Sequence, residues 1–261
     1  MKPLPDLASR LRTGSAVLTR TGTVHVALAL LALALMPFDG RTILGVDPWL
    51  TPFKFMVSLA LSEWTLAWYL AQLEPSRRSE RAIAWTVSLS MLGATVCLWL
   101  QPARGTTSHF NESSVFDGVV FGAMGILILI NTLAAIWLFV LLFVRRTGLS
   151  PALGWGLRLG LGVFLIGSVL GVPMILRGAH SVGVPDGGPG LPFLNWSTVG
   201  GDLRVAHALG LHGLQLFPLI GYWLAARRRS ARWFLVALPA WLALLTVAYL
   251  GAMGARPLWP A

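Results

Sequence analysis

Long apolar runs, separated by short polar or basic segments, dominate the pattern of this chain. Seven of the runs are long enough to cross about 30 Å of hydrocarbon as helices. They lie near residues 22–38, 50–72, 82–101, 116–144, 151–176, 205–226 and 232–252. The pattern predicts an all-α fold, a polytopic integral membrane protein. Its seven-transmembrane-helix bundle occupies residues 22–261, after a basic N-terminal segment at residues 1–21.

Composition agrees with a membrane location. Of the 261 residues, 56% are hydrophobic and only 11% are charged, which lies outside the usual range of a soluble domain. The net charge of +10 comes from short arginine clusters between apolar runs, a distribution typical of membrane topology rather than of nucleic-acid binding. We therefore expect the lipid bilayer as a partner and no nucleic acid. The arginine-rich, lysine-poor composition favours a bacterial inner membrane.

The positively charged residues concentrate in alternate connections between the runs. Fourteen lie before the first run or in every second connection: Lys2, Arg10, Arg12, Arg20, Arg77, Arg78, Arg81, Arg145, Arg146, Arg158, Arg227, Arg228, Arg229 and Arg232. The other six are Arg41, Lys54, Arg104, Arg177, Arg204 and Arg256. Because cytoplasmic segments retain Lys and Arg, we predict a cytoplasmic N-terminus and an extracytoplasmic C-terminus. If the sequence at residues 32–34, Ala-Leu-Ala, were a signal cleavage site, six spans would remain in the same orientation.

The two longest connections on the predicted outer side are residues 101–116 and 177–204, which contain Gly, Pro, Asn and His in place of simple charge. Long loops often carry function, so we expect this face to be the working face and residues 177–204 to form a compact lid. The order Arg-Gly, His, Asn, Asp occurs twice, which indicates either a weak internal repeat or a coincidence. The two sets are Arg104, Gly105, His109, Asn111 and Asp117, and Arg177, Gly178, His180, Asn195 and Asp202.

Residues 200–215, GGDLRVAHALGLHGLQ, bring polar side chains into an otherwise apolar run. His207 and His212 lie about 140° apart around a regular helix, so they cannot bind one ion as an i, i+4 pair does. We expect each histidine to meet partners from other helices. His207 shares a helix face with Arg204, and His212 shares one with Gln215.

A layer of polar side chains is predicted near the middle of the bilayer. Counted from an outer boundary near Leu203, His207 lies about 6 Å deep and His212 about 13 Å deep. Glu63 and Asn131 reach a comparable depth in their own runs. Buried ionisable groups normally face the bundle interior and pair with each other, so we predict a Glu63–His212 pair.

Other residues within the runs are typical of structural roles. Asn131 and Gln215 are uncharged, which favours hydrogen bonds that hold helices together. His25 falls near the cytoplasmic end of the first run and is interpreted as a boundary residue. Four glycines are spaced as small-xxx-small pairs, which allow close helix packing or leave room for a flat cofactor such as haem or a quinone. They are Gly156, Gly160, Gly167 and Gly171.

The outer face gathers candidate metal ligands, because zinc, copper, iron and nickel prefer imidazole and carboxylate groups. Loop hydrogen bonding and helix capping explain the same residues without a metal, and Asp202 is placed to cap the sixth run. The single cysteine, Cys97, excludes an internal disulfide and any CxxC motif. The metal-ligand candidates are His109, His180, His207, His212 and Asp117.

Three functions are compatible with this sequence. The first is binding of haem or a divalent transition metal for a redox or metal-dependent role. The second is a transporter or channel for an ion or small solute that enters from the extracytoplasmic side. The third is an intramembrane metal-dependent hydrolase. The candidate cofactor-binding residues are His207, His212, Asn131 and Gln215, and the candidate catalytic residues, which would relay protons or orient a ligand, are Glu63, Asp202 and Arg204.

Overall fold

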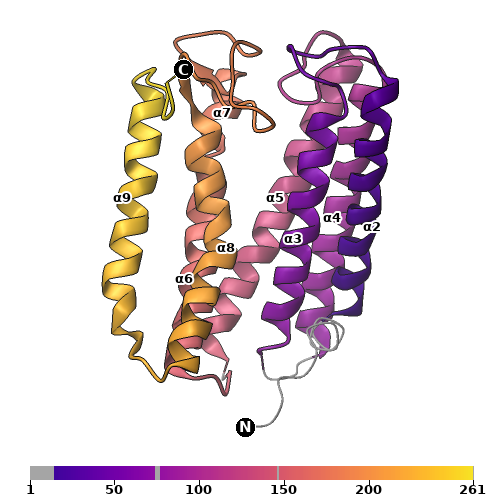
Figure 1. Ribbon diagram of the computed structural model, residues 1–261. Coiled ribbons are helices and arrows are strands. Elements are labelled where there is room, and N and C mark those ends of the chain that lie inside the picture. Colours follow the sequence, from indigo (N-terminus) through magenta and orange to yellow (C-terminus); the bar gives the residue numbers. More distant parts are fainter. Residues whose placement is uncertain (1–14, 74–76, 146, 261) are drawn as a thin grey trace. The chain divides into compact units, whose positions relative to one another are not determined.

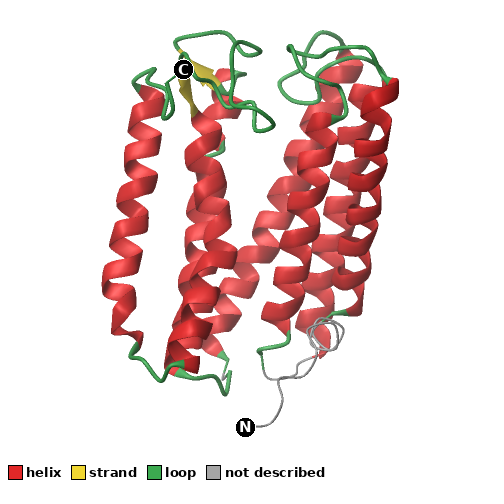
Figure 2. Cartoon of the chain, in the orientation of Figure 1, coloured by secondary structure: helices red, strands yellow, loops and turns green. Residues whose placement is uncertain are grey.

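The computed structural model describes residues 15–73, 77–145 and 147–260, which include every predicted run. Within these residues, seven long α-helices follow one another along the chain (Figures 1 and 2). Each overlaps one predicted run, so the predicted all-α fold is confirmed. The helices are α2 (Ala16–Leu35), α3 (Leu50–Leu70), α4 (Arg77–Ala103), α5 (Val115–Val144), α6 (Pro151–Val169), α8 (Leu203–Ala226) and α9 (Phe234–Met253). The basic residues Lys2, Arg10, Arg12 and Arg146 lie outside the described residues.

Short elements join or extend these helices. Two are 3₁₀ turns, η1 (Met36–Phe38) after α2 and η2 (Ala231–Trp233) before α9. Between α7 (Val172–Arg177) and α8, the strands β1 (Ser181–Val182) and β2 (Gly201–Asp202) pair antiparallel, with Ser181 opposite Asp202. Figure 2 shows this hairpin at one end of α8. The hairpin ties together the two ends of the segment predicted to form a lid.

Six of the long helices are long and apolar enough to cross a membrane. The exception is α3, which carries Lys54 and Glu63 within its apolar sequence. Along α5 and α9, large apolar side chains are exposed over much of each helix, including Val119, Ile126 and Val247. Such surfaces are unfavourable in water and favourable against lipid tails. The chain is therefore a multi-pass membrane protein whose helices contact the bilayer.

The described chain divides into two compact units. Unit 1 contains α2 to α5. It comprises the described residues up to Thr42 and those from Asp47 to Leu149. Unit 2 contains Ile43–Val46 and everything from Ser150 onward. Within each unit, successive long helices run in opposite directions (Figure 1). In unit 1, α2 packs mainly along α3 and α4 along α5, whereas in unit 2 the most extensive packing is between α6 and α8.

The predicted fifth run is divided into α6 and the short helix α7. Pro173 has no N–H with which to bond the carbonyl group of Val169, so a regular helix cannot pass through it unchanged. The chain turns at Gly171, whose N–H bonds the carbonyl oxygen of Ser168 at 3.1 Å. As a result, the carbonyl oxygen of Gly167 is available to a side chain from outside α6.

Close backbone contact between α6 and α8 confirms the packing interpretation of the glycines. A Cβ atom built on Gly167 would lie 2.5 Å from the backbone carbon of Gly210 and 2.5 Å from the nitrogen of Leu211. A Cβ atom on Gly156 would lie 2.7 Å from the carbonyl oxygen of Phe217. Glycine lets two helices approach this closely. The backbone of α8 thus fills the space beside these glycines.

Candidate functional site

A buried polar cluster lies inside unit 1, where α2, α3 and α4 each contribute one side chain. His25 Nδ1 lies 2.9 Å from Glu63 Oε2, and His25 Nε2 lies 3.0 Å from Thr95 Oγ1. His25 and Glu63 are both 0% exposed. Both ring nitrogens of the imidazole are therefore engaged, one by a carboxyl group and the other by a hydroxyl group.

The direction of the hydrogen bonds determines where the protons lie. The hydroxyl group of Thr95 donates to the carbonyl oxygen of Met91 at 2.8 Å, so its oxygen accepts from His25 Nε2–H. The contact between His25 Nδ1 and Glu63 Oε2 then needs one proton of its own. That proton lies either on Nδ1, which gives an imidazolium and a carboxylate, or on Glu63, which gives two neutral groups. Without it, two lone pairs would face each other at 2.9 Å.

The second carboxyl oxygen of Glu63, Oε1, is buried and has no hydrogen-bond partner among the described residues. A buried acceptor without a partner costs about 1–3 kcal/mol. Thr21, one helical turn before His25, lies beside this carboxyl group. The Thr21 hydroxyl oxygen is in turn 3.1 Å from Ser88 Oγ on α4. The carboxyl group therefore has both an unused acceptor and a neighbouring pair of hydroxyl groups.

The surroundings of the pair differ between the two ends of unit 1. Thr21 and Ser88 lie toward the end where α2 and α4 begin. On the opposite side, an apolar cluster packs one or two turns away from the pair. Its buried members are Ala29, Met56, Leu98 and Met124. The pair is thus bordered by hydroxyl groups and buried apolar side chains on one side, and by apolar side chains on the other.

Two predictions about this layer are wrong. His25 is not a boundary residue, because α2 begins at Ala16, six residues before the predicted run, and His25 lies near its middle. The predicted partner of Glu63 was His212, but the structure pairs Glu63 with His25. His212 is exposed on α8. Asn131 on α5 and Gln215 on α8 are half-buried.

At the end of unit 2, Asp202 and Arg204 fix the lid segment to the start of α8. Asp202 is buried and caps α8 by accepting from the N–H of Arg204 at 3.0 Å, so the capping interpretation is confirmed. It also accepts from Ser197 N–H at 2.8 Å and from the Arg204 guanidinium group at 2.6 Å. The same guanidinium group donates to the carbonyl oxygen of Asn195. These contacts give both residues a structural role in holding the lid.

His180 has a partner that the sequence analysis missed. Its Nδ1 lies 2.9 Å from Asp186 Oδ2, and Asp186 also accepts from the N–H groups of His180 and Ser181. Burial disfavours the charged form of Asp186, but the hydrogen bonds from His180 and Ser181 outweigh this effect and lower the pKa of the carboxyl group well below its usual range. The Pro-Asp-Gly-Gly sequence at residues 185–188 is a turn signal that could have identified it.

His207 Nδ1 lies 2.8 Å from the carbonyl oxygen of Gly167, the group left available by the turn at Gly171. A carbonyl oxygen only accepts, so His207 donates from Nδ1. The imidazole ring also packs against Gly171, where an added Cβ atom would lie 3.0 Å from His207 Cε1. His207 therefore donates a hydrogen bond to a carbonyl group at the end of α6. Its ring occupies the space beside Gly171, which has no side chain.

At one end of unit 1, His109 and Asp117 have partners of their own. His109 stacks on Phe55, with ring centroids 5.1 Å apart, and its Nδ1 lies 2.9 Å from Ser108 Oγ. Asp117 is buried and accepts from four side chains, those of Gln101, Arg104, Ser113 and Ser114. Asp117 is the third residue of α5, whereas Asp202 precedes α8, so the two aspartates of the possible repeat occupy different helix positions.

The candidate metal ligands are divided between the two units. His109 and Asp117 belong to unit 1, and His180, His207 and His212 belong to unit 2. Among the described residues, no group of three or more His, Cys, Asp or Glu side chains is placed to hold a metal ion. Comparisons with protein-family models, curated proteins and solved structures find no match to this chain. The function must therefore be inferred from the geometry of its own residues.

Proposed function

We propose that this protein is a proton-translocating membrane transport protein in which the His25–Glu63 pair binds and releases the transported proton. The observation that supports the proposal most directly is the burial of an acid and an imidazole, hydrogen-bonded to each other, near the middle of apolar helices. Ionisable groups at this depth are costly and typically mark ion or proton pathways. This function belongs to the transporter class predicted from the sequence.

The number of protons on the His25–Glu63 pair would link proton binding to movement of the helices. With one proton between Nδ1 and Oε2, the contact is favourable in either protonation pattern. When that proton leaves, the imidazole and the carboxylate repel, and α2 and α3 lose a contact in their shared interior. Loss of a proton thus changes the packing of α2 against α3, as a transport cycle requires.

Access to the pair is expected from one side at a time. Toward the end where α2 begins, Thr21 and Ser88 supply hydroxyl groups beside the pair, although Leu18 and Ile83 are also buried there. Toward the other end, the apolar cluster around Met56 and Leu98 blocks the way. We propose that the blocked side opens when the pair releases its proton. The predicted orientation places the hydroxyl side toward the cytoplasm of a bacterial cell and the apolar side toward the outside.

The haem, metal and hydrolase functions stay predictions from the sequence. They need several imidazole or carboxylate groups to surround one ion or ring. In the described residues, the candidates for this role are instead held by separate partners, such as Asp186 for His180 and Gly167 for His207. The proton function needs no further group, which is why we prefer it.

Proton flux into liposomes tests the proposal. Purified protein is reconstituted with a trapped pH-sensitive dye, and a membrane potential is imposed with potassium and valinomycin. We expect the wild-type protein to acidify the lumen faster than protein-free liposomes. Glu63→Gln keeps the shape of the side chain but removes the exchangeable carboxyl proton, so flux should fall to the protein-free rate. Infrared difference spectra with pH should also lose a carboxyl band in this variant.

Glu80→Gln is the matched control. Glu80 belongs to the same unit but pairs with Arg145 near the helix ends, at 2.7 Å. The same change there should leave the flux unchanged. Equal flux in Glu63→Gln and wild-type liposomes, or a wild-type rate no higher than that of protein-free liposomes, would overturn the proposed function.

A further inference from the structure

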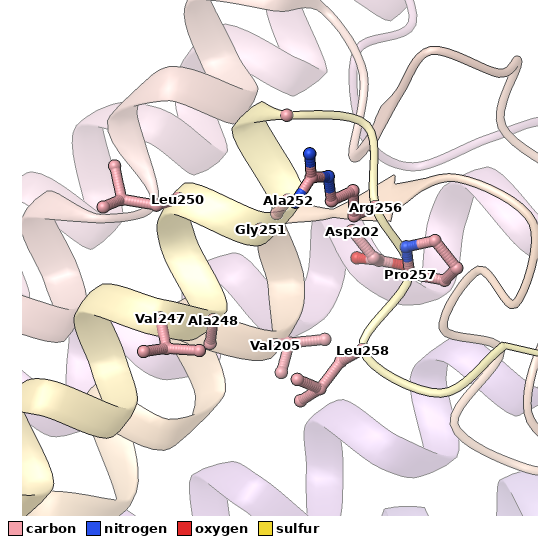
Figure 3. A pocket seen from close by; sticks show the side chains of 11 residues that line it. Asp202, Val205, Val247, Ala248, Leu250, Gly251, Ala252, Arg256, Pro257 and Leu258 are labelled. Atoms are coloured by element: carbon pink, nitrogen blue, oxygen red, sulfur yellow. The ribbon is translucent and has the colours of Figure 1, made fainter.

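A cavity of about 610 Å³ lies in unit 2, where the end of α9 meets the start of α8 and the C-terminal segment. Figure 3 shows Arg256 and Asp202 near each other on one side of it, with Val205, Val247 and Leu258 on the other. One part of the lining is therefore polar, and the rest is aliphatic. None of these residues belongs to the pair in unit 1.

The cavity is lined by one acidic residue, Asp202, and one basic residue, Arg256. The carboxylate of Asp202 is already compensated by Arg204, through contacts as short as 2.6 Å. Arg256 is exposed, and its guanidinium group has no hydrogen bond or ion pair with any residue that the structure describes. The last carbonyl groups of α9 accept from the N–H groups of Gly254, Ala255 and Arg256, which reduces their negative field. An anionic group would therefore find one cation without a competing partner.

The apolar wall continues into the outer surface of α9. Val247 is 62% exposed and Leu250 is 61% exposed, although both line the cavity. In a helix that crosses a membrane, side chains exposed in this way contact lipid tails. Close to the cavity, Trp259 follows Leu258 and stacks on Trp196, with ring centroids 5.8 Å apart. Tryptophans are enriched at the level of lipid headgroups, which agrees with a cavity at the membrane surface.

We propose that this cavity binds an anionic phospholipid, with the phosphate group at Arg256 and an acyl chain along Val247 and Leu250. Each basic side chain near an anionic lipid surface contributes about 1 kcal/mol to the attraction. A free phosphate ion would use only the cation, whereas a phospholipid uses the cation and the apolar wall together. Because Arg256 and the apolar wall line the same cavity, we assign the ligand to the anionic phospholipids.

Native mass spectrometry of the delipidated full-length protein tests the proposal. Phosphatidylglycerol, phosphatidylcholine with the same acyl chains, and inorganic phosphate are added in separate titrations. The wild-type protein should bind phosphatidylglycerol more tightly than phosphatidylcholine. Arg256→Gln should weaken phosphatidylglycerol binding about fivefold, the effect of one basic side chain near an anionic lipid. Arg177→Gln removes the same charge from an exposed position at the end of α7 and should have no effect.

A second variant tests the apolar wall. Val247→Trp places a large side chain at the cavity and should weaken phosphatidylglycerol binding, whereas Val236→Trp, on an equally exposed part of α9, should not. Equal binding of the two lipids by the wild-type protein would overturn the proposal, as would equal effects of Arg256→Gln and Arg177→Gln. Binding of inorganic phosphate that Arg256→Gln removes, with lipid binding unaffected by Val247→Trp, would show a small-anion site instead.

Discussion

The interiors of the two units are held together by different kinds of contact. In unit 1, α2, α3 and α4 are linked by hydrogen bonds among His25, Glu63 and Thr95. In unit 2, α6 and α8 meet through their backbones, at glycines such as Gly156 and Gly167. The polar residues of unit 2 lie mainly at its end, where Asp186 and Asp202 hold the lid segment.

This difference shows where each kind of chemistry can occur. In unit 1 an acid and an imidazole are buried between the helices, where an uncompensated charge is costly. Glycine contacts exclude such groups and gain stability from close packing instead. The proposed proton binding therefore concerns the interior of unit 1, and we expect the α6–α8 pair of unit 2 to serve as a tightly packed support.

The largest expected effect comes from separating the members of the buried pair. His25→Leu leaves the carboxyl group of Glu63 without its partner and should destabilise the protein by about 3–5 kcal/mol. The double variant His25→Leu/Glu63→Met replaces both polar groups with apolar ones and should recover most of this loss. Unfolding free energies in mixed detergent measure both effects. If the double variant is no more stable than the single one, the pair does not act as a unit.

A smaller effect is expected where unit 2 depends on glycine. In Gly167→Ala, the new Cβ atom would lie 2.5 Å from the backbone of α8, so the two helices must separate. Overpacking of this kind should cost about 1–3 kcal/mol in unfolding free energy. Gly154→Ala on the same helix meets only Arg158 Nη1 at 3.8 Å and serves as the control. Equal melting temperatures for the two variants would contradict the close packing of α6 on α8.

The smallest effect concerns the end of unit 2 and depends on pH. Asp186→Asn removes a charge that accepts hydrogen bonds from His180 and Ser181, and should cost about 1–2 kcal/mol at neutral pH. The folded state lowers the pKa of Asp186, so its stabilisation is complete above the unfolded value of about 3.9 and is lost as the pH falls further. Melting temperatures from pH 7 to pH 3 should show the gap between wild type and variant narrowing below about pH 4. A gap of constant size would contradict this role for the charged form.

Much of the fold could be predicted, because a helix that crosses a membrane must be apolar along most of its length. The start of α2 was misplaced, since Arg20 lies inside the helix with its side chain exposed, while Ser15 caps it by accepting from Leu18 N–H. Because the predicted run began six residues too late, His25 was interpreted as a boundary residue, although it lies in the interior of α2. Hydropathy alone cannot show that an arginine such as Arg20 lies inside a membrane helix rather than before it.

The contacts of the candidate site were predicted only in part. Glu63 was identified because a carboxylate in an apolar run is unusual, but its partner was wrong. Depth along a helix indicates which side chains share a level, not which helices are neighbours. Thr95 and Ser88 were missed for a similar reason, since a hydroxyl group in a helix usually bonds its own backbone, as Thr95 also does with Met91.

The three-helix origin of the buried cluster has a consequence for how the protein is made. Synthesis runs from the N-terminus, so α2 enters the bilayer before α3 and α4 exist. During that interval His25 has neither Glu63 nor Thr95 to bond, and a neutral imidazole is far less costly in lipid than a charged one. The hydrogen-bonded cluster can therefore form only after α4 has been made, so the polar part of the core of unit 1 is completed by the third of its helices.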